Sequence, residues 1–421
     1  MKIICVFGLI LALGRLRFPL SLSLFTGSLF LGLWTGMGPI QWLRTALLSI
    51  AQTETLVLCI IVGLIMVLSR MMQGTGHMER LVQSLTRLSR DARTVGSVMS
   101  ALIGLLPMPG GALFSAPFVE TSLSRNGASG EQKTMLNYWF RHIWEFSYPM
   151  YPGWILAVAL LETETWRFLG LMAPMTLFAV LIGIVFILRP LGNEKGTGKG
   201  RVSGQSVKEF LWEGAPLWIV ILVILMLAVF TAVLGKLGYH VQILGPLSIL
   251  PGLAGAALWV GIVNHLGWGQ FKEALKDRRL PNLFLLLLAI MLFKGILVES
   301  QAVLHVRQEL MAYGIPVLIV ILIIPFLSGL MTGVAIGFVG TSFPLVVPMI
   351  QSDQTMVYLS MAGLAFSFGF MGMMMSPVHL CLLVTKDYFK ADLVKIYRSL
   401  ILPVIATMMA AGIYFSLTRA L

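Results

Sequence analysis

Long apolar runs, separated by short polar segments, follow one another along almost the whole chain. A helix that crosses a bilayer needs about 20 consecutive, mostly apolar residues. Ten runs approach or exceed that length, and we predict a membrane-spanning helix for each: 2–14, 18–36, 55–73, 138–160, 167–188, 211–236, 241–265, 283–298, 356–385 and 399–418. The pattern predicts an all-α polytopic membrane protein.

Two further apolar stretches are interrupted in the middle. Residues 97–122 carry Pro-Met-Pro-Gly-Gly at 107–111, and residues 315–350 carry several glycines and Gly-Thr-Ser-Phe-Pro at 340–344. The legs on either side are too short to cross, so both stretches are predicted to be re-entrant hairpins that enter the membrane and return to the same side. Two kinked full spans are the alternative.

Composition and charge fit this class. The chain has 421 residues, of which 57% are hydrophobic and 11% charged, whereas a soluble domain has about 25% charged residues. The one hydrophilic insert, 190–209, is too small for a separate soluble domain. Of the 30 Lys and Arg residues, 21 fall on the side of that insert and six on the opposite side. The positive-inside rule then predicts a cytoplasmic insert and external termini, in a bacterial or archaeal inner membrane. The net charge of +12 reflects topology, and no nucleic-acid partner is expected.

The two halves of the chain resemble each other. Ser-Ala-Pro at 115–117 matches Ser-Phe-Pro at 342–344 with an offset of 227 residues, and Ser147 matches Ser376 with an offset of 229. We predict two repeats, 1–189 and 210–421, joined by a cytoplasmic linker, 190–209. Each repeat has five spans and one hairpin, and because five is odd the second is inverted. Inverted repeats with discontinuous helices are typical of secondary transporters, whose sites lie near the membrane centre.

The hairpins and helix breaks carry the candidate binding groups. The first hairpin tip leaves the N–H groups of its returning leg unpaired, and a helix N-terminus attracts anions. Hydroxyl groups add donors, and freed carbonyls of the second hairpin can bind Na⁺. The predicted substrate-binding residues are Pro109, Gly110, Gly111, Ser115, Arg141, His142, Ser147, Thr341, Ser342 and Ser376. The predicted coupling-ion residues are Glu145, Ser328, Gly329 and Thr332. Alternatively, the glycines only let helices pack closely.

Three ionisable residues lie inside the predicted span 138–160. In an α-helix, a spacing of four puts Arg141 beneath Glu145, and a spacing of three puts His142 beside it. Ionisable groups in a membrane are costly and mark functional sites by default. We therefore predict that Glu145 carries the coupling ion. A purely structural Arg141–Glu145 pair is the alternative.

Cysteines and enzyme motifs give no further chemistry. Cys5, Cys59 and Cys381 are odd in number and widely spaced, and only His379 lies near one of them, without a further ligand. We predict neither a disulfide nor a metal site, and a packing or interfacial role for His379. The chain has no His-Glu-x-x-His and no Gly-x-Ser-x-Gly, so it is not expected to be an enzyme or to need a cofactor.

Three segments carry a family resemblance: 105–117 (LLPMPGGALFSAP), 137–145 (NYWFRHIWE) and 374–382 (MMSPVHLCL). They resemble a family of ten-span integral membrane proteins with a domain of unknown function. That family looks like a member of the ion-transporter superfamily, which includes gluconate, citrate and C4-dicarboxylate carriers. The resemblance implies a homodimer with paired hairpins and ion- or proton-coupled transport, but no particular substrate.

Together these features predict a secondary-active transporter of a small organic anion, most simply a carboxylate, coupled to Na⁺ or H⁺. Alternating access would be of the elevator or rocking type. The expected partners are the anion, membrane lipid and a second copy of the chain. A cation/proton antiporter is the alternative within transport. A membrane-embedded lipid-handling protein or enzyme is the alternative outside it.

Overall fold

In the computed structural model, all the regular secondary structure of the described residues is helical. The structure describes residues 2–420 apart from 78–79, 82–83, 85–90, 106–110, 124–126, 192–203, 240–242, 244, 303–304, 306–307, 310–311 and 351. The helices are α1 (Lys2–Arg15), α2 (Leu20–Trp34), α3 (Pro39–Ala51), α4 (Thr53–Gly74), α6 (Ala92–Gly104), α7 (Ala112–Ser122), α8 (Gly130–His142), α9 (Pro152–Leu160), α10 (Thr165–Gly183), α11 (Gly204–Glu213), α12 (Ala215–Lys236), α13 (Ile249–Val263), α14 (Trp268–Leu275), α15 (Leu280–Glu299), α17 (Val317–Thr332), α18 (Ala335–Val346), α19 (Thr355–Met374), α20 (Leu380–Tyr388) and α21 (Leu393–Arg419).

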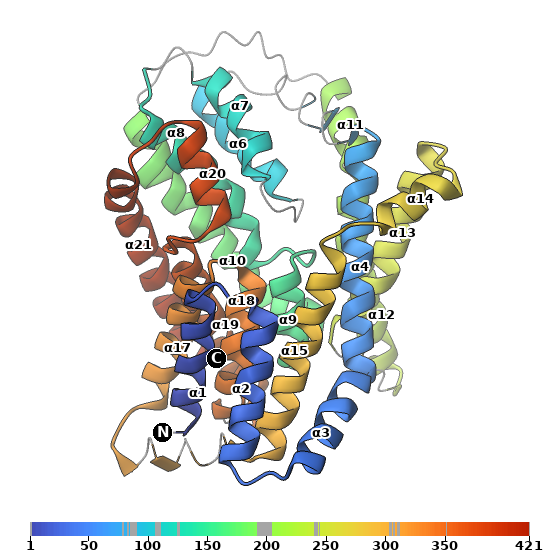
Figure 1. Cartoon of the computed structure of the whole chain (residues 1–421). Coiled ribbons are helices and arrows are strands. Elements are labelled where there is room, and N and C mark those ends of the chain that lie inside the picture. Colours follow the sequence, from blue (N-terminus) through green and yellow to red (C-terminus); the bar gives the residue numbers. More distant parts are fainter. Residues whose placement is uncertain are drawn as a thin grey trace.

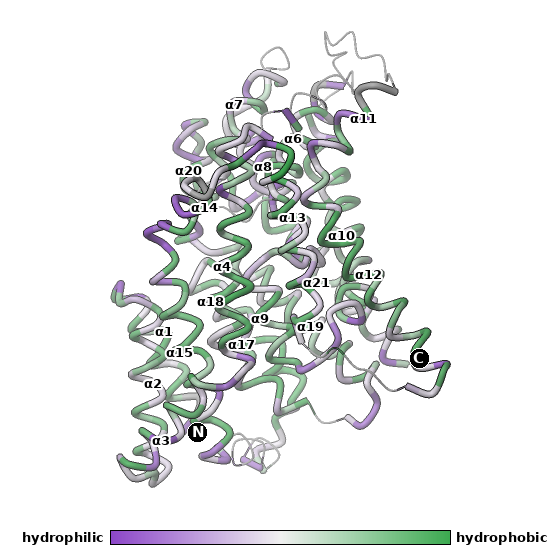
Figure 2. Tube along the Cα trace, turned by 90° about the vertical axis from the view of Figure 1, so that its right-hand side faces the viewer, coloured by the Kyte–Doolittle hydropathy of each residue, from purple (hydrophilic) through white to green (hydrophobic). Residues whose placement is uncertain are grey.

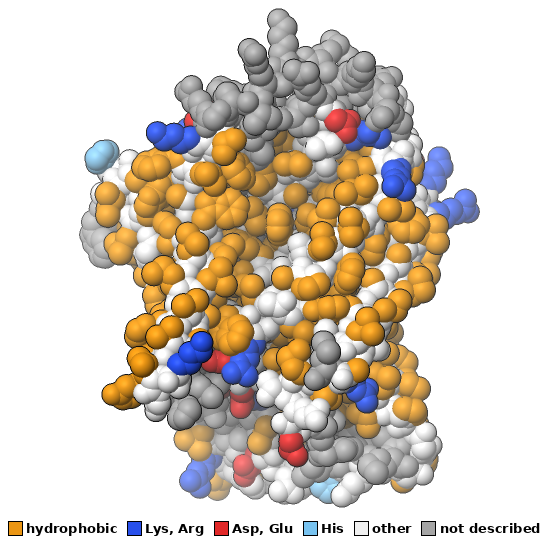
Figure 3. Space-filling view, turned by 180° about the vertical axis from the view of Figure 1, so that it is seen from behind, with side chains coloured by type: hydrophobic (Ala, Val, Ile, Leu, Met, Phe, Trp, Pro, Cys, Tyr) orange, Lys and Arg blue, Asp and Glu red, His pale blue; other side chains and the backbone are white. Residues whose placement is uncertain are grey.

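The chain has the character of a membrane protein. Seven helices of the described part are long and apolar enough to cross a membrane: Thr53–Gly74, Thr165–Leu191, Ala215–Lys236, Pro246–Val263, Leu280–Glu299, Thr355–Met374 and Leu393–Arg419. Figure 2 shows hydrophobic residues along the middle of the long helices and hydrophilic residues gathered towards their ends. Seen from behind (Figure 3), hydrophobic side chains cover the middle of the molecule, with Lys and Arg along its upper edge and across its lower third.

The remaining three predicted spans have a different form. Runs 2–14 and 18–36 became α1 and α2, of 14 and 15 residues, which pack against each other. At 1.5 Å per residue, α1 is about 21 Å long, shorter than the roughly 30 Å hydrocarbon core. Run 138–160 is not one helix but α8 and α9, separated by a 3₁₀ turn at Ile143–Phe146 and an irregular stretch. A count of ten spans therefore stays a prediction.

In the described part of the chain, the short helices α3, α11 and α14 were not predicted. Helix α3 occupies a segment that was expected to be a loop, and it buries Trp42, Ala46 and Ser49 along one face. Helix α14 lies in the loop before α15. Helix α11 begins at Gly204, inside the predicted linker 190–209, so the end of that linker is helical. Short amphipathic helices of this kind lack the long apolar run by which spans were recognised.

Both interrupted stretches fold as helical hairpins. The first consists of α6 and α7, and its tip, 106–110, lies outside the described residues. In the second, α17 ends at Gly333, whose φ of 64° is left-handed and suits glycine, and α18 starts at Ala335. In Figure 1, the α6–α7 hairpin lies at the upper end of the molecule and the α17–α18 hairpin in its lower half.

The halves share one order of elements: a long helix, a hairpin, a broken helix and a second long helix. In the first half these are α4, α6–α7, α8–α9 and α10, and in the second they are α15, α17–α18, α19–α20 and α21. In Figure 1, α8 lies above α9 whereas α19 lies below α20, so the two broken helices run in opposite directions. An inverted repeat would have this order and direction, and it stays a prediction.

Topology can be tested directly. In Figure 1, α11 lies at the upper end and both termini lie in the lower half. Together with the cation asymmetry, this arrangement predicts that a reporter fused at residue 200 and one fused after Leu421 give opposite signals in paired cytoplasmic and external reporter assays. The same side for both sites would contradict the inverted repeat.

Glycines set the packing of the second hairpin on α19. A Cβ atom at Gly372 would overlap the carbonyl oxygen of Phe326, and one at Gly329 would overlap that of Gly369. Helices α17 and α19 therefore touch backbone to backbone, as small residues allow in membranes. Gly329 therefore has a packing role, and its predicted role in ion binding stays a prediction.

Candidate functional site

Two helix breaks meet inside the molecule and bring together side chains that lie far apart in the sequence. Helix α8 ends at His142, and α20 begins directly after His379. Both imidazoles are buried, and their Nε2 atoms lie 3.2 Å apart. The rings meet edge to face, with centroids separated by 4.9 Å. We call Arg141, His142, Glu145 and His379 the break cluster.

Glu145 lies within this cluster and is only 8% exposed. Its carboxylate oxygen Oε1 lies 3.8 Å from His142 Nε2. A 3₁₀ helix has three residues per turn, so residue i+3 stands over residue i. Because the chain turns in this way at Ile143–Phe146, Glu145 aligns with His142. An α-helical spacing would place Arg141 beneath Glu145, but the chain does not continue as an α-helix there. Among the described residues, the basic group within 4.0 Å of the Glu145 carboxylate is His142, which is charged only when protonated.

Arg141 instead ties the cluster to the first hairpin. Its guanidinium donates a hydrogen bond of 3.0 Å to the carbonyl of Ile103, in the last turn of α6. A cation suits this end of a helix. Tyr151, beyond the 3₁₀ turn, donates to the neighbouring Gly104 carbonyl, and Trp144 donates to Ala101 over 2.8 Å. The break in α8–α9 is thus bonded to α6 at several points.

His142 has a defined hydrogen-bond geometry. Its Nδ1 lies 2.6 Å from the carbonyl oxygen of Tyr138, so that nitrogen carries the proton and donates. The other ring nitrogen, Nε2, lies 3.2 Å from His379 Nε2 and 3.8 Å from the Glu145 carboxylate. Tyr138 in turn donates through its hydroxyl group to the carbonyl of Met374 over 2.9 Å, which joins α8 to the end of α19.

His379 and Cys381 are functional candidates that the sequence analysis did not identify. His379 was expected to have a packing or interfacial role, but it contacts His142 from a position 237 residues away. With Cys381 these two imidazoles form a buried group whose ligand atoms all lie within 4.8 Å of one another. Two imidazoles and a thiol could hold a transition metal ion. The argument against a metal site, that His379 and Cys381 have no further ligand, does not hold in the folded chain.

Asn137 is a second residue that the sequence analysis missed. It is completely buried, and its amide donates to the Ala112 carbonyl at the start of α7 over 3.0 Å and to Thr385 of α20 over 3.3 Å. Its carbonyl oxygen accepts from Ser100 of α6 over 3.0 Å. One side chain therefore links the first hairpin, α8 and α20. In the sequence it stands just before the predicted span 138–160, so nothing there marked it as buried.

The predicted hydroxyl groups of the first half form hydrogen bonds with residues outside the break cluster. Ser147 shares a hydrogen bond of 2.7 Å with Thr176 of α10. Ser115 bonds within its own helix, to the Ala112 carbonyl over 3.2 Å. Gly111 is buried and precedes α7. Pro109 and Gly110 lie outside the described residues, so the predicted anion site at that tip stays a prediction.

The second hairpin brings several predicted residues together. Ser328 and Thr341 share a hydrogen bond across its two legs, and Ser342 donates to the Phe338 carbonyl over 2.6 Å. However, the carbonyls expected to be free already accept hydrogen bonds: Thr332 donates its hydroxyl to Ser328 over 2.8 Å, and the Gly333 amide donates to Gly329 over 2.9 Å. The premise of freed carbonyls is therefore wrong for this conformation, and Na⁺ binding there stays a prediction.

Within the described residues, the returning legs of the two hairpins pack against different helices. Helix α7 packs against α6, α8 and α20, whereas α18 packs against α9, α15, α17 and α19. The second break comes closer to the second hairpin. A Cβ atom at Gly333 would stand 2.9 Å from Ser376 Oγ and 3.0 Å from the His379 backbone nitrogen. The tip of α17–α18 therefore rests on the break that carries Ser376 and His379.

Comparison with known proteins places the chain in a family. A family described as "Protein of unknown function (DUF401)" matches residues 2–417. The chain belongs to this family. Its description names no activity, so DUF401 membership by itself assigns none.

No curated protein matches the chain. The YdaH transporter of Alcanivorax borkumensis, described as having an unusual topology, is similar in structure at 13% identity and a TM-score of 0.47, over 85% of this chain and 84% of that one. At this level of similarity the match establishes neither a shared mechanism nor a shared substrate.

Proposed function

We propose that the chain is a secondary-active transporter of a small organic anion of the carboxylate class, coupled to Na⁺ or H⁺. The observation that carries this proposal is the break cluster: four buried ionisable side chains where two discontinuous helices meet. Irregular backbone at membrane depth persists only where protein or a water-filled cavity satisfies it. Ionisable groups at that depth mark ion or proton paths in transporters.

The architecture supports the same proposal. Both halves contain a hairpin with legs of 11 to 16 residues followed by a broken helix, and the broken helices run in opposite directions. We propose re-entrant hairpins in an inverted repeat of the ion-transporter-superfamily type, assembled as a homodimer in a cytoplasmic membrane with external termini. One repeat unit would move against the other in an elevator or rocking motion.

Within this scheme Glu145 carries the coupling ion. His142 of its own segment lies 3.8 Å from its carboxylate, and His142 in turn lies 3.2 Å from His379 and within 4.8 Å of Cys381, both from the second break. A charge carried on Glu145 can therefore be passed to, or balanced by, groups on both halves of the chain. The hydroxyl groups of Ser328, Thr332, Thr341 and Ser342 would complete the ion path along the second hairpin, and the cycle needs no cofactor.

An uptake screen in proteoliposomes tests the proposal. Labelled carboxylates would be offered with an imposed Na⁺ or H⁺ gradient. We expect accumulation of at least one carboxylate above the level of empty liposomes, and only with a gradient. Ion exchange without any organic solute would instead indicate a cation/proton antiporter. Neither process, together with changed lipid composition or distribution, would indicate a lipid-handling protein.

A further inference from the structure

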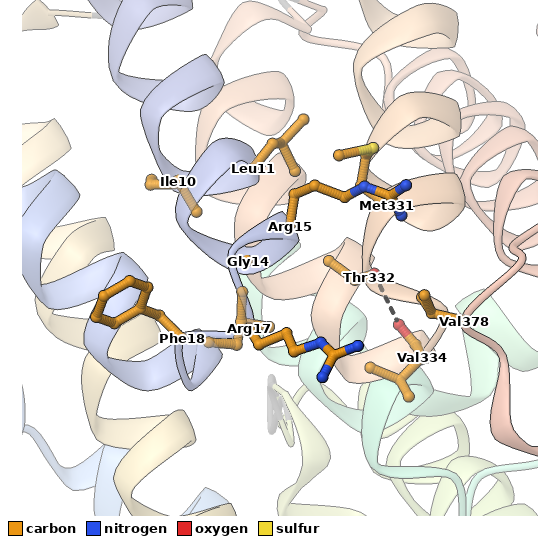
Figure 4. Close-up of a pocket in the computed structure, with 11 residues that line it drawn as sticks. Ile10, Leu11, Gly14, Arg15, Arg17, Phe18, Met331, Thr332, Val334 and Val378 are labelled. Carbon is orange, nitrogen blue, oxygen red and sulfur yellow. Dashed lines mark hydrogen bonds between the residues drawn. The ribbon is translucent and has the colours of Figure 1, made fainter.

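A cavity of about 600 Å³ lies between the end of α1 and the tip of the α17–α18 hairpin. Its polar lining comes from Arg15, Arg17 and Thr332. Figure 4 shows both guanidinium groups extending from the end of α1 towards the hairpin, where Met331, Thr332, Val334 and Val378 form the opposite wall. Because α1 is too short to cross a bilayer, these two cations lie at the end of a helix that stops part-way through the molecule (Figure 1).

The positive charge of this cavity is not neutralised. Its lining contains no acidic residue, and in the described part of the chain no acidic side chain pairs with Arg15 or Arg17. The other large cavities differ. In one of about 620 Å³, Lys294 Nζ lies 2.8 Å from Glu162 and 3.7 Å from Glu54. In one of about 820 Å³, Lys395 faces Glu131 over 3.9 Å. Arg15 and Arg17, which are both exposed, therefore have no acidic partner in the described part of the chain.

The backbone around the cavity adds to this preference for anions. Helix α18 starts at its edge with Val334 as N-cap, and no side chain caps its first N–H groups. Such a helix end favours negative charge. The C-terminal end of α1 would oppose it, but the carbonyls of Ala12, Leu13 and Gly14 already accept hydrogen bonds from the turn that follows. Arg17, in that turn, has a left-handed φ of 68°, a conformation that non-glycine residues adopt at a cost.

One segment connects this cavity to the break cluster. Val378 lines the cavity, and the next residue, His379, contacts His142. The hairpin tip at Gly333 lies against the same segment, because a Cβ atom there would approach Ser376 and His379 within 3.0 Å. An anion bound between α1 and the hairpin tip would therefore lie next to the segment that carries His379 of the break cluster.

We propose that this cavity binds a small solute with two negative charges, a dicarboxylate or a phosphate-like dianion, and that Arg15 and Arg17 are its ligands. Two guanidinium groups with no acidic partner match two negative charges, and charge-assisted hydrogen bonds to them are among the strongest that proteins make. The N-terminal end of α18 would orient the anion. This inference rests on the proposed function and assigns to it a binding site and a charge class. The phosphate of an anionic lipid has the same chemistry, so the test must separate the two sources.

Calorimetric titration of the full chain in detergent tests the site, with succinate, malate, citrate and inorganic phosphate as probes and acetate as a monoanion control. We expect at least one dianion to bind, and binding to weaken about tenfold or more in R15Q/R17Q. R15K/R17K should recover part of the affinity. R44Q, which removes an exposed arginine on α3, should bind as the unaltered chain does.

Several outcomes would overturn the assignment. One is that no dianion of the panel binds, and another is that R15Q/R17Q binds as tightly as R44Q. A third is that only phosphatidylglycerol, compared with phosphatidylcholine in nanodiscs, stabilises the chain through these arginines, which would make the cavity a lipid headgroup site. Transport separates the two proposals. If the chain takes up an anion under a gradient but R15Q/R17Q binds dianions as the unaltered chain does, only the proposed binding site is contradicted. If dianion binding depends on the two arginines but no uptake occurs, only the proposed transport function is contradicted.

Discussion

The substitution Glu145→Gln should reduce gradient-driven uptake of the anion to the level of empty liposomes, while exchange of anion across the same membranes continues. A carboxamide has the size of a carboxyl group but cannot take up a proton or carry a negative charge to bind Na⁺. Glu145 is buried beside His142 at the meeting of the two breaks. Removing its charge should therefore uncouple the ion from the solute and leave the solute path largely intact.

A structural role for Glu145 predicts a different result. In that case Glu145→Gln should lower the yield of folded protein, because breaking a buried ionic contact leaves its partners uncompensated. A double variant that removes both ends of the contact, His142→Met with Glu145→Met, should then recover the yield. The control is Glu299→Gln, which makes the same chemical change at an exposed site. A stable Glu145→Gln protein with unchanged, still gradient-driven transport would rule out the coupling role.

The substitution Gly372→Ala should remove most of the folded protein. The added methyl group would overlap the Phe326 carbonyl oxygen, which belongs to the backbone of α17 and cannot rotate away. Inserting one methyl group into a packed core costs about 1 to 3 kcal/mol, and more where backbone must shift. Because α17 and α19 are in direct backbone contact, the added methyl group should push the second hairpin away from α19.

Gly412→Ala is the matched control, because it places the same methyl group in a helix, α21, where nothing lies within 4 Å. Its folded yield should equal or exceed that of the unaltered chain, since alanine is the better helix former. The measurement is the monodisperse fraction and its melting temperature in detergent. Equal values for Gly372→Ala and Gly412→Ala would contradict the close packing of α17 on α19.

The sequence was informative where the signal is local. Apolar run length predicted the membrane class and most of the long helices. The Pro-Met-Pro-Gly-Gly and Gly-Thr-Ser-Phe-Pro segments marked both hairpins, and the density of ionisable residues at 141–145 marked the break cluster. Each of these features depends on neighbours within about one or two helical turns. A single sequence displays such features directly.

The missed features depend on contacts between distant segments. His379 looked isolated because its partner His142 lies 237 residues away, and Asn137 bonds to Thr385 across 248 residues. The α-helical spacing that aligned Arg141 with Glu145 failed because the chain tightens to a 3₁₀ turn there. Arg15 and Arg17 were counted only as topological charges, since nothing local shows that α1 ends beside the second hairpin. Such contacts arise only once the two halves are packed together.

The most direct test of coupled transport is whether the ion gradient sets the direction of anion movement. Proteoliposomes would be loaded with the transported anion at equal concentrations on both sides, and a Na⁺ or H⁺ gradient would then be imposed in either direction. A secondary-active transporter should move the anion one way under one gradient and the opposite way when that gradient is reversed. No net movement of the anion under either gradient, in liposomes where the same protein still exchanges labelled anion, would contradict coupling through the break cluster.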